Sequence, residues 1–241
     1  MPCRRRPQGA ATPGLLVAAA LLVLGLLVAL GLAAGSEGWS WAWRDEADLI
    51  TAIRAPRTLG ALLAGALLGL SGALAQGLFR NPLADPYLLG SAAGAGLGVV
   101  LVLAAGGLVG LEMGFAAAGA LQRLGLVGAA FCGALLGMVL TLALARGAGQ
   151  PMTLLLAGVV VGVLLTALSD VLLLLSPEAL RGKQVFLLGT TSFFGWPSVV
   201  ALAIALALTL PVAVRLSRAL DALVLGLPWQ RIGEGGIITL V

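Results

Sequence analysis

Two arginines ahead of a long apolar run are the residues whose type and spacing most clearly suggest a chemical role. Arg54 and Arg57 flank Pro56 at the start of that run. A guanidinium can bind a carboxylate through two parallel hydrogen bonds, so a pair at one helix end suits the docking of an acidic partner. For either arginine alone, the simpler interpretation is anchoring at the boundary between water and an apolar phase.

A single acidic residue, Asp170, lies well inside another apolar run. It continues a row of Gly158, Gly162 and Thr166 at a spacing of four, so a helix places all four residues on one face. A carboxylate inside lipid costs about 2.5–3.5 kcal/mol on insertion scales, and such residues usually have a function. Asp170 is therefore a candidate for lining a pathway. The alternative is a hydrated position near the membrane surface.

Several chemistries are excluded by the residues that the sequence lacks. It contains no histidine, and its two cysteines, Cys3 and Cys132, form no C-x-x-C pair. Imidazole catalysis is therefore excluded, and neither a zinc site nor a disulfide framework is indicated. No G-x-x-x-x-G-K-[ST] loop is present, so ATP would have to be bound by another subunit. We expect no catalytic residue, no metal site and no cofactor, and hence no enzyme.

The composition predicts a membrane protein. Apolar residues make up 60% of the chain and charged residues 10%, with a mean hydropathy of +1.10. About 20 apolar residues are enough for a helix to cross the hydrocarbon core. We predict an all-α, polytopic transmembrane helix bundle of about six spans. The runs that would form these spans are 14–34, 58–79, 88–109, 124–145, 152–175 and 197–214.

The basic residues indicate orientation in the membrane. All 14 lysines and arginines are scattered between the apolar runs, without the basic stripe that nucleic-acid binding requires. Arg4, Arg5 and Arg6 precede the first run, whose apolar stretch is longer than the core of a signal peptide. Because early basic residues usually set orientation, we predict a retained first helix, a cytoplasmic N-terminus and residues 35–57 outside.

Small residues recur every four positions along five of the runs. Such rows allow helix backbones to approach closely, which is how helices associate in lipid. They predict a compact bundle. The rows are Ala61, Gly65, Gly69, Ala73 and Gly77; Gly90, Gly94 and Gly98; Gly125, Ala129, Gly133, Gly137, Thr141 and Ala145; Gly158, Gly162 and Thr166; and Ala201, Ala205, Thr209 and Ala213.

A tight turn is predicted between the second and third runs. Asn81-Pro82 and Asp85-Pro86 disfavour helix just before each proline, so the chain should reverse here on the inner side. An ordinary connecting turn with no function of its own would also explain this pattern.

The segment from Arg54 to Val99 resembles the permease subunits of bacterial ATP-binding-cassette importers for iron–siderophore complexes, haem and cobalamin, the FecCD-like family. Those proteins carry an R-x-P-R helix start, a G-x-x-x-x-x-S-G-x-x-x-Q body and an N-P-L-A-x-P-x-x-L-G turn. A second similar segment covers 154–190, so the resemblance spans roughly 14–226. The matching positions in the first segment are Arg54, Pro56, Arg57, Gly65, Ser71, Gly72, Gln76, Asn81, Pro82, Leu83, Ala84, Pro86, Leu89 and Gly90.

The resemblance implies a role for each of these parts in the bacterial inner membrane. Two permease copies would form a passage for a metal chelate, working with an ATPase subunit and a substrate-binding protein. Arg54 and Arg57 would dock the binding protein. The inner gate would be the turn formed by Asn81, Pro82, Leu83, Ala84 and Asp85. A short cytoplasmic helix after the sixth span would grip the ATPase and would begin with Leu220, Asp221, Ala222, Leu223 and Gly226.

The sequence departs from the family pattern after Gly226. Residues 1–226 therefore read as an incomplete permease domain and 227–241 as an atypical tail, as though a reading frame had shifted or the product had been shortened. Pro228 would break the coupling helix. The expectation is that the 241-residue chain does not transport on its own. Two alternatives stay open: a membrane protein without a transport role, and an ion-driven secondary transporter with Asp170 as its ionisable group.

Overall fold

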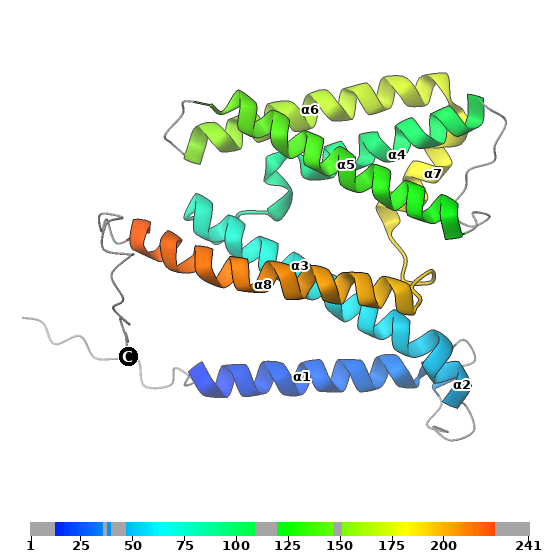
Figure 1. The fold of residues 1–241 in the computed structure, drawn as a ribbon, viewed down its shortest axis with the longest axis vertical. Helices are drawn as coiled ribbons and strands as arrows, with labels where there is room; N and C mark the ends of the chain where they lie inside the picture. The colour runs from blue at the N-terminus through cyan, green and yellow to red at the C-terminus, as the bar shows by residue number, and fades with distance from the viewer. Residues whose placement is uncertain (1–12, 36–37, 40–46, 109–119, 147–150, 225–241) are drawn as a thin grey trace, which may run out of the picture. The chain divides into compact units, whose positions relative to one another are not determined.

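The structure is almost entirely helical. The computed structural model describes residues 13–35, 38–39, 47–108, 120–146 and 151–224. Its helices are α1 (Pro13–Ala33), α2 (Ala47–Leu49), α3 (Ala55–Phe79), α4 (Ser91–Leu108), α5 (Ala120–Leu144), α6 (Pro151–Leu175), α7 (Pro177–Leu188) and α8 (Trp196–Val224), shown in Figure 1. A π-helical segment, η1 (Ile50–Arg54), and a 3₁₀ turn, η2 (Pro86–Leu89), join them. The predicted all-α class is confirmed.

The only strands in the described ranges are two residues long. β1 (Ala34–Gly35) pairs antiparallel with β2 (Gly38–Trp39), and Ala34 lies opposite Trp39. This short pair follows directly on α1, so the chain reverses direction at the end of the first helix.

Within the part of the chain that the structure describes, five helical segments are long and apolar enough to cross a membrane. They are Gly14–Ala33, Ala47–Phe79, Leu124–Leu144, Met152–Leu175 and Trp196–Ser217. The third predicted run forms a shorter apolar helix, Ser91–Gly106. The predicted start of that run at 88 was wrong, because residues 86–89 form the 3₁₀ turn and Gly90 adopts a left-handed conformation with φ 75°. The chain is a multi-pass membrane protein.

The second membrane helix begins earlier than its apolar run predicted. The helical path starts at Ala47 and continues through the π-helical residues Ile50–Arg54 into α3. Proline lacks an N–H, and its ring clashes with the carbonyl four residues back, so a regular helix does not accept it easily. The wider π turn directly before Pro56 accommodates the ring. Arg54 therefore lies within the helix, where the sequence placed it at the helix start.

The last helix is longer than its predicted run. α8 covers Trp196–Val224 and contains Pro211 in its interior, whereas the sequence suggested a span of 197–214 with a separate short helix after it. The backbone of Leu220–Leu223 is thus a continuation of α8, and Gly226 lies outside the described residues.

The described residues divide into two compact units. One contains α1, the strand pair, α2, η1, the part of α3 up to Ala66, and residues 191–207. The other contains residues 67–190 and the chain from Leu208 onward.

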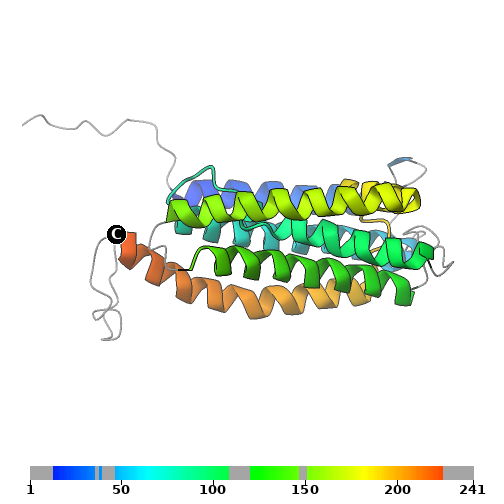
Figure 2. The same cartoon turned by 90° about the horizontal axis from the view of Figure 1, so that it is seen from above.

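In the second unit, α4 packs directly on α5 through glycines. A Cβ added to Gly94 would collide with the carbonyl of Gly133, and one added to Gly98 would collide with the carbonyl of Ala129. Figure 2 shows α4, α5 and α6 running side by side. The small-residue rows predicted for the third and fourth runs are therefore real contact surfaces. On α3, in contrast, a Cβ at Gly65 or Gly69 would meet no atom of the described chain within 4 Å.

Side-chain packing completes this unit around the glycine contacts. Val99, Leu103, Leu126 and Ala179 form one buried cluster, which joins α7 to α4 and α5. Gly182 on α7 permits this approach, because an added Cβ would lie 2.5 Å from Cδ1 of Leu103. The short helix α7 is thereby fixed beside α4.

Candidate functional site

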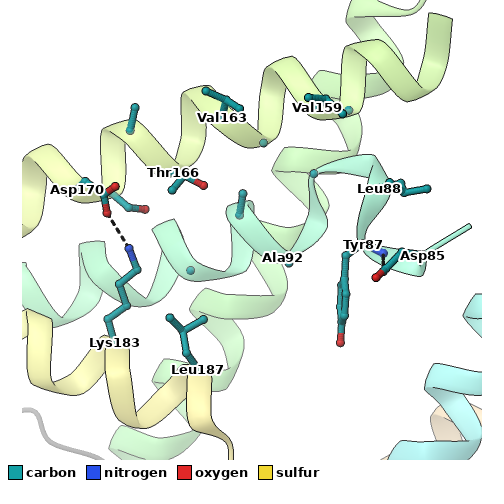
Figure 3. A pocket seen from close by; sticks show the side chains of 17 residues that line it. Asp85, Tyr87, Leu88, Ala92, Val159, Val163, Thr166, Asp170, Lys183 and Leu187 are labelled. Carbon is teal, nitrogen blue, oxygen red and sulfur yellow. Dashed lines mark hydrogen bonds and ion pairs between the residues drawn. The ribbon is translucent and has the colours of Figure 1, made fainter. Parts of the chain in front are cut away.

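A pocket in the second unit lies between η2, α4, α6 and α7. Its volume is about 790 Å³. The α6 wall includes the small residues at a spacing of four that lead to Asp170. They lie on one face of this helix, as the sequence predicted. Figure 3 shows Val159, Val163 and Thr166 along this helix, with Leu187 of α7 opposite. The members of the row that line the pocket are Gly158, Gly162, Thr166 and Asp170.

An ion pair lies at the α7 end of this pocket. Lys183 Nζ donates to Asp170 Oδ1 at 3.1 Å, drawn as the dashed line in Figure 3. The Asp170 side chain is 62% exposed and that of Lys183 only 15%. Ser176 and Pro177 reverse the chain between the two helices, which brings residues 13 positions apart together. The carboxylate is thus exposed on one side and charge-paired on the other.

Sequence reasoning missed Lys183 as a partner of Asp170. One signal was available, because Lys183 is the only lysine in the whole chain and stands in a polar segment just after the run that contains Asp170. A lone intramembrane carboxylate usually pairs with an opposite charge, so the two basic residues just downstream, Arg181 and Lys183, were the candidate partners of Asp170.

The turn at Asn81–Asp85 stabilises itself through its own side chains. Asn81 Oδ1 accepts from the N–H of Leu83 at 2.9 Å, and Asp85 Oδ1 accepts from the N–H of Tyr87 at 2.7 Å. The second bond caps η2, which has Pro86 at its first position. The predicted turn is confirmed, and its polar side chains are engaged in local structure. Its role as an inner gate stays a prediction.

The pocket carries polar groups at both of its ends. Asp85 and Tyr87 line it at the turn, and Asp170 with Lys183 lines it at the other end. Between them the walls are mostly Gly, Ala, Leu and Val, with Thr166 and Ser169 as the hydroxyl groups. In Figure 3 the Tyr87 ring extends from η2 beside the labelled Asp85. The structure thereby places one residue of the predicted gate, Asp85, in the same pocket as Asp170.

The two predicted docking arginines differ in accessibility. Arg54 is only 8% exposed, and its Nη1 donates to the Leu32 carbonyl at 3.4 Å. Arg57 is exposed and donates through Nη2 to the Ser192 carbonyl at 3.1 Å. Both lie in the first unit, close to the end of α1. Of the two, Arg57 is the one that an approaching protein could reach without displacing other groups.

The fold and the pocket define a multi-pass helical protein with a lined cavity between its helices, an arrangement suited to transport. The comparison with known protein families identifies the class of membrane protein. Residues 14–228 match the model of the FecCD transport family, and this chain belongs to that family.

Two curated relatives and one solved structure illustrate the similarity. The ferric enterobactin transport system permease protein FepD of Escherichia coli K12 is 34% identical over 227 residues, which are 90% of this chain and 64% of FepD. The vitamin B12 import system permease protein BtuC of Salmonella paratyphi A is 39% identical over 163 residues, 64% of this chain and 44% of BtuC. A solved metal-chelate type ABC transporter in an inward-facing conformation has a similar fold, with a TM-score of 0.69, 24% identity, and coverage of 92% of this chain and 70% of that one. The chain thus spans less than two thirds of the length of either relative.

Proposed function

We propose that the chain is a permease subunit of an ATP-binding-cassette importer and forms the passage for a metal chelate such as an iron–siderophore complex, haem or cobalamin. The observation that carries the proposal is the family match over residues 14–228. The permeases for ferric enterobactin and vitamin B12 among its relatives support a bulky chelate as the substrate. The largely apolar walls of the 790 Å³ pocket suit a ligand whose charge is masked by its chelator.

The proposed partners follow from the same function. A separate ATPase hydrolyses ATP and engages the segment of Leu220, Asp221, Ala222, Leu223 and Gly226. A substrate-binding protein that carries the chelate docks at Arg57, with Arg54 supporting the same helix, and a second permease copy completes the passage. The conformational cycle of the ATPase then shifts the bundle between inward and outward openings. The turn at Asn81–Asp85 would serve as the inner gate.

A chimeric permease tests this function. Residues 1–226 of this chain, joined to the remaining C-terminal part of FepD, are expressed in E. coli that lacks FepD and retains the ATPase and binding protein. We expect uptake of labelled ferric enterobactin that is abolished by an ATPase-inactive variant and unaffected by a protonophore added at constant ATP. A chimera that inserts and assembles with the ATPase, yet takes up neither ferric enterobactin nor, in a matching BtuC chimera, cobalamin, would contradict the proposal.

The Asp170 carboxylate is proposed to face the passage. In the chimera, Asp170→Leu should leave membrane insertion unchanged and lower the uptake rate several-fold, because the polar end of the pocket loses its charge. Lys183→Met is the matched control, since it breaks the same ion pair and keeps the carboxylate. A larger loss with Asp170→Leu than with Lys183→Met supports a pathway role. Normal uptake by Asp170→Leu would show that the carboxylate is merely interfacial.

The proposed orientation places the N-terminus in the cytoplasm and residues 35–57 outside. We expect a cysteine at the exposed Asp48 to react with a membrane-impermeant maleimide in intact cells, in a background with Cys3 and Cys132 replaced by serine. A cysteine at Leu83, which is 88% exposed in the opposite turn, should react only after the membrane is opened. The reverse pattern would invert the topology.

A further inference from the structure

The indole of Trp196, the first residue of α8, donates a hydrogen bond to the π-helical segment before α3. Its Nε1 lies 3.0 Å from the Thr51 carbonyl oxygen, and both residues belong to the first unit. In a π-helix each carbonyl accepts from the N–H five residues later, as the Ile50 carbonyl does from Ala55. The corresponding donor for Thr51 would be Pro56, which has no N–H. Trp196 therefore supplies the hydrogen bond that the proline cannot give to Thr51.

The turn before Trp196 is fixed against α3 by an aromatic ring. The N–H of Phe194 donates to the Thr191 carbonyl at 3.0 Å, which closes a turn with Ser192 at a central position. The Phe194 ring lies on Gly60 of α3, where an added Cβ would collide with the ring. Gly60 is buried, and a larger residue there would push the ring and its turn away from the helix.

This turn presents its Ser192 carbonyl to Arg57. The guanidinium donates to that carbonyl through Nη2 at 3.1 Å. A guanidinium has five N–H groups, so the exposed Arg57 side chain keeps donors for a carboxylate. A long side chain samples many rotamers, and a partner that binds it has to order them. The bond to Ser192 orders the Arg57 side chain before a partner arrives.

We propose that Phe194 and Trp196 are positioning residues for docking: they hold the Ser192 turn against α3, and this turn directs the Arg57 guanidinium toward a carboxylate of the binding protein. The proposal rests on the docking role of Arg57 proposed above. Neither aromatic residue contacts the partner itself, and each acts through Arg57.

Electron paramagnetic resonance on the purified full chain tests the attachment of the turn without a binding protein. A spin label is placed on a cysteine at the exposed Thr191, with both native cysteines replaced by serine. We expect Phe194→Leu and Trp196→Phe each to raise the mobility of the label, because each removes one contact of the turn. Phe131→Leu is the matched control on α5, where Phe131 is 63% exposed, and it should leave the spectrum unchanged.

Docking is measured by surface plasmon resonance on the chimeric permease described above, assembled with its ATPase in nanodiscs, with the E. coli binding protein for ferric enterobactin. We expect Phe194→Leu and Trp196→Phe each to weaken binding about two- to ten-fold, which is the effect of leaving one long side chain unordered. In an Arg57→Gln background the same variants should have no further effect, because they act through Arg57. A merely structural role would lower the affinity by the same factor in both backgrounds.

Three results would overturn the proposal, and each identifies a different error. An unchanged label spectrum in both variants would show that the aromatic residues do not hold the turn. Equal losses of affinity with and without Arg57 would show that they act in another way, such as anchoring at the membrane boundary. If Arg57→Gln itself binds with unchanged affinity, the docking role of Arg57 is wrong, and the positioning role is wrong with it.

Discussion

Replacing Gly133 by alanine should destabilise the second unit strongly, whereas the same replacement at Gly128 should leave it as stable or more so. In an exposed helix, glycine to alanine normally stabilises by up to about 1 kcal/mol, because alanine is the better helix former. At Gly128 an added Cβ meets no described atom within 4 Å, so this gain applies. At Gly133 the Cβ collides with the carbonyl of Gly94, and a backbone group cannot rotate away as a side chain does.

The helices α4 and α5 must therefore move apart to accept Gly133→Ala. Overpacking of this kind typically costs about 1–3 kcal/mol, and here it also separates the neighbouring contact of Gly98 with Ala129. Thermal unfolding of the two variants in the same detergent, followed by circular dichroism and by size-exclusion profile, measures the difference. A midpoint for Gly133→Ala equal to that of Gly128→Ala would show that the glycine contact does not hold these helices together.

Charge reversal at Arg57 should weaken capture of the proposed binding protein at least ten-fold, and more than the same change at Arg54. Hydrogen bonds to charged groups contribute about 1.5–3 kcal/mol, and Arg57→Glu also adds repulsion toward an acidic partner. Arg54 is only 8% exposed and donates to the Leu32 carbonyl, so its reversal should act mainly on folding. Surface plasmon resonance with the assembled transporter in nanodiscs gives both affinities.

A charge swap separates docking from a fold defect. Glutamates of the binding protein reversed to arginine should restore affinity to the Arg57→Glu transporter and not to the Arg54→Glu one. The affinity should also fall with rising salt for the unchanged pair, because exposed charges are screened. If the Arg57→Glu transporter binds the binding protein with unchanged affinity, Arg57 is not part of the docking surface.

The membrane spans and the tight turn could be predicted because lipid imposes a simple rule on sequence. A run of about 20 apolar residues has few alternatives to a helix, and prolines after Asn81 and Asp85 prevent a helix from continuing. The rows of Gly94 and Gly133 were readable for a related reason, since small residues at a spacing of four share one helix face. These features are local in sequence, and the structure contains them.

The features that could not be predicted depend on neighbours distant in sequence or on small helix irregularities. Apolar periodicity does not reveal that a π turn lets the helix pass Pro56, so the start at Ala47 was missed. The burial of Arg54 arises from the approach of α1, which no pattern around Arg54 encodes. The pairing of Asp170 with Lys183 needs the reversal at Ser176 and the docking of α7. The burial of Arg54 and the Asp170–Lys183 pair both depend on which helices pack together, and the sequence pattern alone does not determine that packing.

The turn between α3 and α4 has a mechanical consequence. Its internal bonds from Asn81 and Asp85 make residues 81–89 a stiff link, and on each side of that link stands a residue with a left-handed backbone, Arg80 at φ 50° and Gly90 at φ 75°. For a residue other than glycine this conformation costs about 1–2 kcal/mol, so Arg80 is a point where strain is stored. Thr141 Oγ1 of α5 donates to the Leu89 carbonyl, and a Cβ on Gly158 of α6 would collide with the Leu88 carbonyl, so η2 is held to α5 and α6. A change of angle between α3 and α4 would therefore fall at Arg80.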